Sequence, residues 1–213
     1  MKILHSSDLH GGFKKLLRTA IEFDVWVDSG DFFPNKTRGD ISVEPVWQKK
    51  WAVWKGVGPR LCDWLKGRPL VCIGGNHDYT DLAAIVRSAG GTAFNLADGP
   101  VTIGGKTFAG FRDIPYIAGE WAGETHEFSG LVAEAMACDP DFLVTHAPPA
   151  GILDTNGTHP CGIKPLTAHL SYAPHRVVAH MFGHIHTQGG SVVSEMGITF
   201  SNAATGINPL GFE

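Results

Sequence analysis

Residues that can hold a metal ion gather at five places along this chain of 213 residues, which includes 11 histidines. At two of these places the residues are spaced two apart: Asp8 with His10, and His184 with His186. Residues two apart in an extended segment point to the same side, so each pair can serve one ion. The other three places are Gly30-Asp31, Gly75-Asn76-His77-Asp78 and His146.

The residue types at these places indicate which metals they would bind. Imidazole nitrogens with carboxylate and amide oxygens, without sulfur, suit Mn, Fe or Zn better than Ca²⁺ or a thiolate zinc site. The candidate ligands outnumber those that one four-coordinate ion needs. Their number matches a site in which two ions share a carboxylate. Two divalent ions, two carboxylates and a hydroxide leave a charge of about +1, which attracts an anionic phosphate ester. The candidate ligands are Asp8, His10, Asp31, Asn76, His146, His184 and His186.

A short apolar run precedes each of the five places. Continuous apolar runs of this length predict strands that are buried on both faces. In an α/β sheet, ligands bind just beyond the carboxyl ends of the strands. We therefore expect the five places to meet at one edge of a sheet. The runs are residues 2–4, 24–27, 69–73, 142–144 and 177–182.

Helical patterns and turns lie between these runs. Residues 13–23, 81–88 and 124–137 have helical spacing, and so does the interval 43–65, in which the tryptophans are expected to be core residues. Pro59 should split that long helix near Gly58. Two hairpins are expected over 100–111 and 190–201, turning at Gly104-Gly105 and Met196-Gly197. The pattern predicts an α/β core with additional antiparallel strands, in a single domain spanning residues 1–213.

Composition excludes several classes of protein. The chain is 43% hydrophobic and 18% charged, which excludes a disordered chain. Its net charge of −4 argues against extended duplex nucleic acid as a partner. We expect no membrane partner, because no apolar run reaches about 18 residues. The four cysteines form no C-x-x-C pair, and the N-terminus lacks the apolar region of a signal peptide, which together predict a cytoplasmic protein. The oligomeric state is left open.

The five motifs taken in order, D-x-H, G-D, G-N-H-D, H and G-H-x-H, resemble those of the calcineurin-like metallophosphoesterases. They extend from Asp8 to His186, nearly the whole chain. Residues 145–154, 181–186 and 199–203 are similar to a narrower subgroup, the brain-type metallophosphoesterase-domain proteins and the bacterial class III cyclic-nucleotide phosphodiesterases. The fold that the resemblance implies is α/β, with two packed β-sheets flanked by helices in a four-layer sandwich.

The resemblance also implies a role for each motif residue. One ion would be held by Asp8, His10, Asp31 and His186, and the second by Asp31, Asn76, His146 and His184, with Asp31 bridging. The two divalent ions would be Mn by preference, with Fe and Zn as alternatives. His77 matches the family's catalytic histidine, which would protonate the leaving oxygen or stabilise the pentacoordinate phosphorus after attack by a bridging hydroxide.

Four further residues have two open readings each. Asp78 could orient His77 or cap the following helix. Arg112 could clamp a phosphate or pair with Asp113. Phe32 could stack on a nucleobase or plug the core. His159 could line the substrate cleft or belong to a surface loop.

The function expected from the motifs is hydrolysis of a small phosphodiester, with cyclic nucleotides among the candidate substrates. A nuclease of the same fold, acting on single-stranded or short nucleic acid, is an alternative, and so is a phosphomonoesterase. The protein serine/threonine phosphatases continue the second motif as G-D-x-x-D-R-G, from which residues 30–36 depart. A non-catalytic interaction module is the remaining alternative, and the intact ligand set counts against it.

Overall fold

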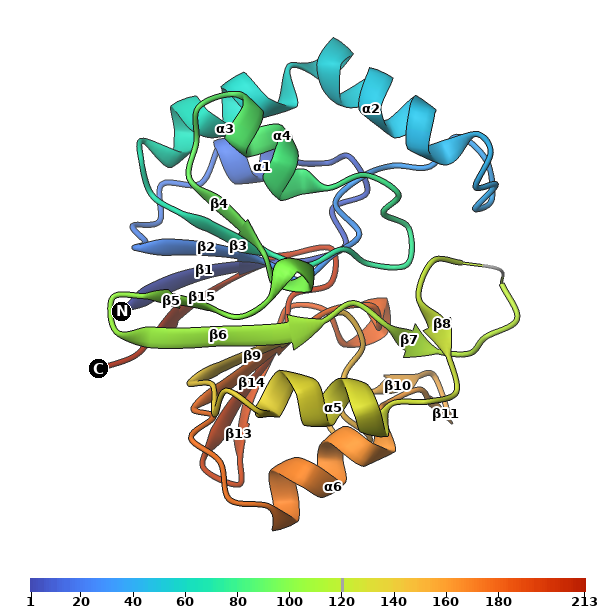
Figure 1. The fold of residues 1–213 in the computed structure, drawn as a ribbon, viewed down its shortest axis with the longest axis vertical. Coiled ribbons are helices and arrows are strands. Elements are labelled where there is room, and N and C mark those ends of the chain that lie inside the picture. The colour runs from blue at the N-terminus through green and yellow to red at the C-terminus, as the bar shows by residue number, and fades with distance from the viewer. Residues whose placement is uncertain (120) are drawn as a thin grey trace.

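Two β-sheets form the centre of the molecule, seen edge-on in Figure 1. The computed structural model describes residues 1–119 and 121–213. The first sheet has five strands, of which β1 to β4 are parallel and β15 is antiparallel to β1. In spatial order the strands are β15 (Ile207–Gly211), β1 (Lys2–Ser6), β2 (Val25–Asp28), β3 (Leu70–Cys72) and β4 (Ala93–Asn95).

The second sheet has six strands. Its four central strands are parallel, and each edge strand is joined to its neighbour as an antiparallel hairpin. In spatial order the strands are β13 (Ser191–Glu195), β14 (Ile198–Asn202), β12 (Ala179–Phe182), β9 (Phe142–Thr145), β6 (Lys106–Phe111) and β5 (Val101–Ile103).

Helices cover the outer face of each sheet (Figure 1). The first sheet is covered by α1 (Lys14–Leu17), α2 (Glu44–Lys55), α3 (Val57–Leu65) and α4 (Leu82–Ser88), and the second by α5 (Ser129–Met136) and α6 (Lys164–Tyr172). Short elements complete the chain: η1 (Leu96–Asp98), η2 (His186–Gln188), the pair β7 (Ile114–Pro115) and β8 (Glu124–Thr125), and the pair β10 (Thr155–Asn156) and β11 (His159–Pro160).

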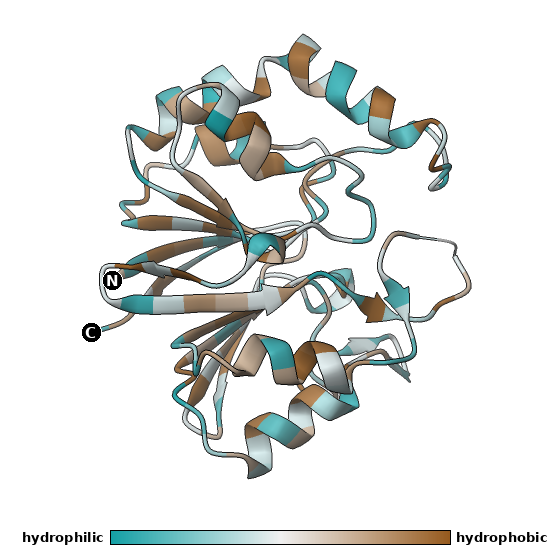
Figure 2. Ribbon diagram, viewed as in Figure 1, coloured by the Kyte–Doolittle hydropathy of each residue, from teal (hydrophilic) through white to brown (hydrophobic). Residues whose placement is uncertain are grey.

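The strands are buried on both faces, as their continuous apolar runs predict. In β2, Val25 and Val27 pack between the sheets with Val144 and Met181, whereas Trp26 packs under the helices. Figure 2 shows apolar colouring along the strands of both sheets and striped colouring on the helices. The resulting order of layers, helix, sheet, sheet, helix, confirms the expected four-layer α/β fold.

Both predicted hairpins are present. Gly104-Gly105 and Met196-Gly197 form their two-residue turns, with positive φ at all four residues. Two-residue hairpin turns of this kind need positive φ at both positions, which glycine adopts without strain.

Several predicted boundaries were wrong. The helix expected over 13–23 is only Lys14–Leu17, and the one expected over 124–137 starts at Ser129. The long helix divides at Gly56, which has φ 59°, rather than near Gly58, so Pro59 lies in the first turn of α3 where its missing N–H costs nothing. Trp54 is 76% exposed and is not a core residue. The single-domain organisation stays a prediction.

No helix in the described part of the chain combines the length and apolar character needed to cross a membrane.

Candidate metal centre

The candidate ligands all follow parallel strands, six of them in loops and His186 at the start of η2. Asp8 and His10 follow β1, Asp31 follows β2, and His146 follows β9. Asn76 follows β3, and His184 and His186 follow β12. Because both sheets present the carboxyl ends of these strands at the same side, opposite the chain termini in Figure 1, the loops meet there.

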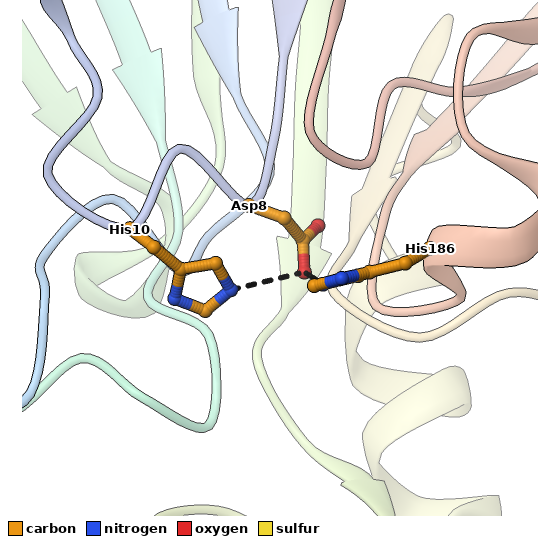
Figure 3. A group of neighbouring side chains, drawn as sticks. All are labelled: Asp8, His10 and His186. Carbon is orange, nitrogen blue, oxygen red and sulfur yellow. Dashed lines mark hydrogen bonds and ion pairs between the residues drawn. The ribbon is translucent and has the colours of Figure 1, made fainter.

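Asp8 has one carboxylate oxygen held by the protein and one that faces other candidate ligands. Its Oδ2 accepts hydrogen bonds from Ser7 Oγ at 2.6 Å and from the backbone N–H of His184 at 2.9 Å. Its Oδ1 lies 3.0 Å from His186 Nε2 and 4.0 Å from His10 Nε2, as drawn in Figure 3. The three side chains therefore form a ready ligand group with one fixed carboxylate at its centre.

Asp31 lies between two groups of candidate ligands. The first group is Asp8, His10 and His186, and the second is Asn76, His146 and His184. Its Oδ1 accepts a hydrogen bond from the backbone N–H of His77 at 2.7 Å. Its Oδ2 lies 3.3 Å from His146 Nε2 and 4.0 Å from His10 Nε2. One oxygen thus faces ligand nitrogens from both groups, which is the arrangement that a shared carboxylate requires.

Asn76 joins the remaining histidines. Its Oδ1 lies 3.0 Å from His146 Nε2 and 3.1 Å from His184 Nδ1. The Nδ1–H of His146 donates to the carbonyl of Ser29 at 2.8 Å, which orients the ring so that Nε2 faces Asp31 and Asn76. All seven candidate ligands are therefore linked by short contacts in one continuous cluster.

The charges of Asp31 and His146, the most buried pair in this cluster, interact strongly. Burial alone would lower the pKa of His146, but Asp31 and Asp8 outweigh it and raise that pKa to about 9. Burial alone would raise the pKa of Asp31, but His146, His77 and His10 hold that pKa below the usual range of a carboxyl group. Without a metal ion, the ionised carboxylate of Asp31 thus lies beside a protonated His146, and a divalent ion that bound there would displace this proton. Carboxylate, amide and imidazole groups together form a donor set that fits divalent transition metals.

The backbone at the site is strained. Asp8, His10, Asp31 and His184 have φ of 52°, 42°, 56° and 65°, in the left-handed region that residues with a Cβ rarely adopt. Gly183 permits the close approach beside Asp8, because a Cβ there would lie 2.0 Å from Ser7 Oγ. Strain concentrated at side chains with ligand chemistry is typical of a functional site.

His77 lies next to the cluster with its ring partly accessible. Its Nδ1 donates to Asn35 Oδ1 at 2.6 Å, and its Nε2 lies 3.9 Å from Asp31 Oδ2. Its ring packs against Trp121, with ring centroids 4.1 Å apart. Burial lowers the pKa of His77, although Asp31 opposes this effect.

Asp78 has neither of the two roles considered from the sequence. Its buried carboxylate accepts the backbone N–H groups of Phe32, Phe33 and Gly75 at 2.9–3.2 Å. It therefore ties the loop after β2 to the loop after β3. The cap of α4 is Asp81, whose Oδ1 accepts the N–H of Ala83 at 2.8 Å.

The three substrate-contact candidates have different outcomes. Phe32 is fully buried in the core, so the stacking role was wrong and the plug reading holds. Arg112 makes no ion pair with Asp113 among the described residues; its Nη2 donates to the carbonyls of Gly75 and Asp78 and supports the loop that carries Asn76 and His77. His159 is exposed on β11, where Thr158 is its hydrogen-bond partner.

Three residues near His77 were missed from the sequence. Asn35 orients the ring, Trp121 packs against it, and Gln48 Nε2 donates to the backbone carbonyl of His77 at 2.7 Å. They come from the loop after β2, from the β7–β8 connection and from α2. No motif marks them, since their only signal is proximity in space.

Comparison with known proteins agrees with this architecture. The family model described as calcineurin-like phosphoesterase matches residues 1–188. A UPF0046 protein of Caenorhabditis elegans is 35% identical over 109 residues, a match that covers 51% of this chain and 37% of that relative. The match therefore spans well under half of the relative's length. Because the family model covers most of the chain, the chain belongs to the calcineurin-like phosphoesterases.

Proposed function

From this family membership, which implies metal-dependent phosphoester hydrolysis, we propose that the chain is a phosphodiesterase with two metal ions that acts on a small substrate. Cyclic nucleotides are among the candidate substrates. The observation that carries the proposal is the position of Asp31 Oδ2, which lies within 4.0 Å of nitrogens of His10, His77 and His146. A carboxylate oxygen there can be shared by two ions beside a proton donor.

The residues divide between the two ions as follows. Asp8, His10, Asp31 and His186 would hold the first ion, and Asp31, Asn76, His146 and His184 would hold the second. Mn is the favoured metal, with Fe and Zn also compatible with this donor set. When bound, the ions supply Lewis acidity that neutralises the phosphoryl oxygens and lowers the pKa of a water molecule.

The chain's own residues supply orientation and a proton. His77 Nε2 faces the cluster, because Asn35 accepts the hydrogen bond from Nδ1–H. Hydrolysis adds the hydroxyl of water to phosphorus and breaks the bond to the leaving oxygen. In its imidazolium form, which carries Nε2–H as well as Nδ1–H, His77 would give the Nε2 proton to the leaving oxygen, and the proton released by the water would restore the charged ring. The backbone N–H of His77 donates to Asp31 Oδ1, so the acid and the shared carboxylate are fixed relative to each other.

We also propose a cytoplasmic location. The support is that all four cysteines are free thiols in the described structure, and Cys72 is fully buried with a raised pKa. Cell fractionation with antibody detection tests this.

The function is tested by hydrolysis of bis-p-nitrophenyl phosphate beside p-nitrophenyl phosphate. The protein is treated with a chelator, assayed, and assayed again after Mn²⁺ is added back. We expect Mn²⁺-restored activity that favours the diester, and little activity from the His77→Ala variant. Preference for the monoester would instead indicate a phosphatase. No activity on either substrate, with two metal ions bound, would contradict the proposal.

A further inference from the structure

Gln48 is a fully buried amide on the inner face of α2. A buried amide costs free energy unless its donors and its acceptor find partners. Its Nε2 donates to the backbone carbonyls of Pro34 at 3.3 Å and of His77 at 2.7 Å. Its Oε1 accepts the backbone N–H of Tyr79 at 2.8 Å. All three partners are therefore backbone groups.

These partners belong to the loops that carry His77 and the residue that orients its ring. Pro34 directly precedes Asn35 in the loop after β2. Tyr79 follows His77 by two positions in the loop after β3. Because Asn35 accepts the His77 Nδ1–H at 2.6 Å, the orientation of the ring depends on the distance between the two loops. A single amide that bonds to both loops fixes that distance.

The backbone of His77 is held on both sides of its Cα. Its N–H donates to Asp31 Oδ1 at 2.7 Å, which fixes it relative to the shared carboxylate. Its carbonyl accepts Gln48 Nε2 at 2.7 Å and Asn35 Nδ2 at 3.2 Å, so both lone pairs are used. Gln48 is the closer of these two donors, and it comes from a helix, which supports a site more precisely than a loop does.

Helix α2 is itself fixed to the protein, so it can act as a support. Trp51, on the same face as Gln48, packs in the core between the first sheet and its helices. Glu44 lies one turn before Gln48 and is buried as well, and its Oε1 accepts the backbone N–H of Thr37 at 2.6 Å. The helix therefore holds the loop after β2 at two successive turns.

We propose that Gln48 is a positioning residue of the reaction, which places the His77 ring relative to Asn35 and the shared carboxylate of Asp31. It acts through the backbone of His77 and does not touch the reacting atoms. No hydrogen bond between described residues joins Gln48 to any of the seven candidate ligands. The inference rests on the proposed function, in which His77 gives a proton to the leaving oxygen. Loss of Gln48 should then slow proton donation while both metal ions stay bound.

The positioning role predicts a dependence on the leaving group. Phenolate, released from diphenyl phosphate, is a stronger base than p-nitrophenolate, so its departure depends more on a proton donor. Gln48→Met keeps a side chain of similar length without the amide. In the Mn²⁺-loaded protein it should lower kcat for diphenyl phosphate by about 10–100-fold. The loss with bis-p-nitrophenyl phosphate should be smaller, so the ratio of kcat for the nitrophenyl ester to kcat for the phenyl ester rises.

Two further variants separate positioning from general damage. Gln48→Asn keeps an amide but is one methylene shorter, so it cannot span both loops and should show the same rise in the ratio. Leu170→Ala opens a cavity in the core of the second sheet, a cluster that includes no described residue of either loop. It should be less stable than the parent protein but keep the parent's ratio, because a smaller folded fraction lowers both kcat values equally.

A second readout does not depend on activity. In the metal-free, isotope-labelled protein, the Nδ1–H of His77 should exchange slowly with water in NMR spectra, because it is hydrogen-bonded to Asn35. The His77→Ala variant identifies the signal by its loss. In Gln48→Met this proton should exchange about 10-fold faster or more, since the two loops separate more readily.

Failure of this inference is distinguishable from failure of the proposed function. An unchanged kcat ratio or unchanged exchange in Gln48→Met, with a parent protein that hydrolyses both esters, overturns the positioning role and leaves the phosphodiesterase proposal standing. Faster exchange in Gln48→Met, with a parent protein that binds two metal ions and hydrolyses neither ester, supports the control of the His77 ring by Gln48 and overturns the phosphodiesterase proposal.

Discussion

Asn35 brackets His77 from two sides. Its Oδ1 accepts the hydrogen bond from His77 Nδ1–H at 2.6 Å, and its Nδ2 donates to the backbone carbonyl of His77 at 3.2 Å. The ring is thereby held with Nε2 toward Asp31, 3.9 Å from its Oδ2. Because the group that orients the ring is a neutral amide, Asn35 places no negative charge beside His77.

The His77–Asn35 pair predicts two graded losses of turnover. His77→Ala should lower kcat by about 10²–10⁴-fold, because it removes the proton donor, while both metal ions stay bound. Asn35→Ala should lower kcat by about 10-fold with little change in KM, because the ring remains but its orientation is lost. Steady-state kinetics with bis-p-nitrophenyl phosphate measures both, and full activity of a metal-loaded His77→Ala protein would overturn the mechanism.

Replacement of Asp31 should affect metal content rather than the proton donor. In Asp31→Asn the oxygen that faces both groups of ligands carries no full charge, so we expect fewer than two metal ions per chain by elemental analysis. Asp63→Asn, a change at an exposed residue of α3, is the matched control and should keep the parent's metal content. Two tightly bound ions in Asp31→Asn would contradict the bridging role.

Arg112 should contribute to stability through the loop after β3. Its guanidinium donates to the carbonyls of Gly75 and Asp78, and hydrogen bonds from charged groups contribute about 1.5–3 kcal/mol each. We expect Arg112→Ala to lower the free energy of unfolding by about 2–3 kcal/mol, measured by urea denaturation. Arg38→Ala, at an exposed residue, should change it by less than about 0.5 kcal/mol. Equal stabilities of the two variants would show that these contacts are dispensable.

His180 should make stability depend on pH. It is fully buried against Phe182 and Phe200, with Nε2 paired to Thr145 Oγ1 at 2.7 Å, and burial lowers its pKa from 6.5 to about 3. The unfolded chain therefore binds a proton at this histidine below pH 6.5, while the folded chain does so only near pH 3. The contribution of the neutral, buried His180 to the free energy of unfolding is fully present above pH 6.5 and is lost as the pH falls toward 3.

Between these pH values the free energy of unfolding falls by about 1.4 kcal/mol per pH unit because of His180. Comparison with a variant that lacks this histidine isolates the effect. Urea denaturation of the metal-free protein between pH 6 and pH 4 gives the slope for the parent and for His180→Leu. We expect the parent's slope to be steeper by about 1.4 kcal/mol per pH unit, whatever the absolute stability of the variant. Parallel slopes would show that His180 takes up its proton in the folded state.

The residue types and their order along the chain were enough to predict the main strands, an α/β core and the set of candidate ligands, whereas the four-layer arrangement was implied by the resemblance to the calcineurin-like metallophosphoesterases. These features are local, because an apolar run followed directly by Asp, Asn or His specifies both a buried strand and the side chains at its end. The turns at Gly104-Gly105 and Met196-Gly197 could also be predicted from the sequence, since two-residue hairpins need residues that tolerate positive φ.

Only the tertiary structure decided what surrounds His77. Asn35 and Trp121 reach it from loops 42 and 44 positions away in the sequence, and neither has a spacing that marks it. The same holds for Phe32, whose burial depends on the helices that cover the first sheet, and for Asp78, whose three N–H donors come from two separate loops. Such contacts depend on how distant segments pack, so a pattern along the chain cannot specify them, whereas the candidate ligands can be identified from the strands that they follow.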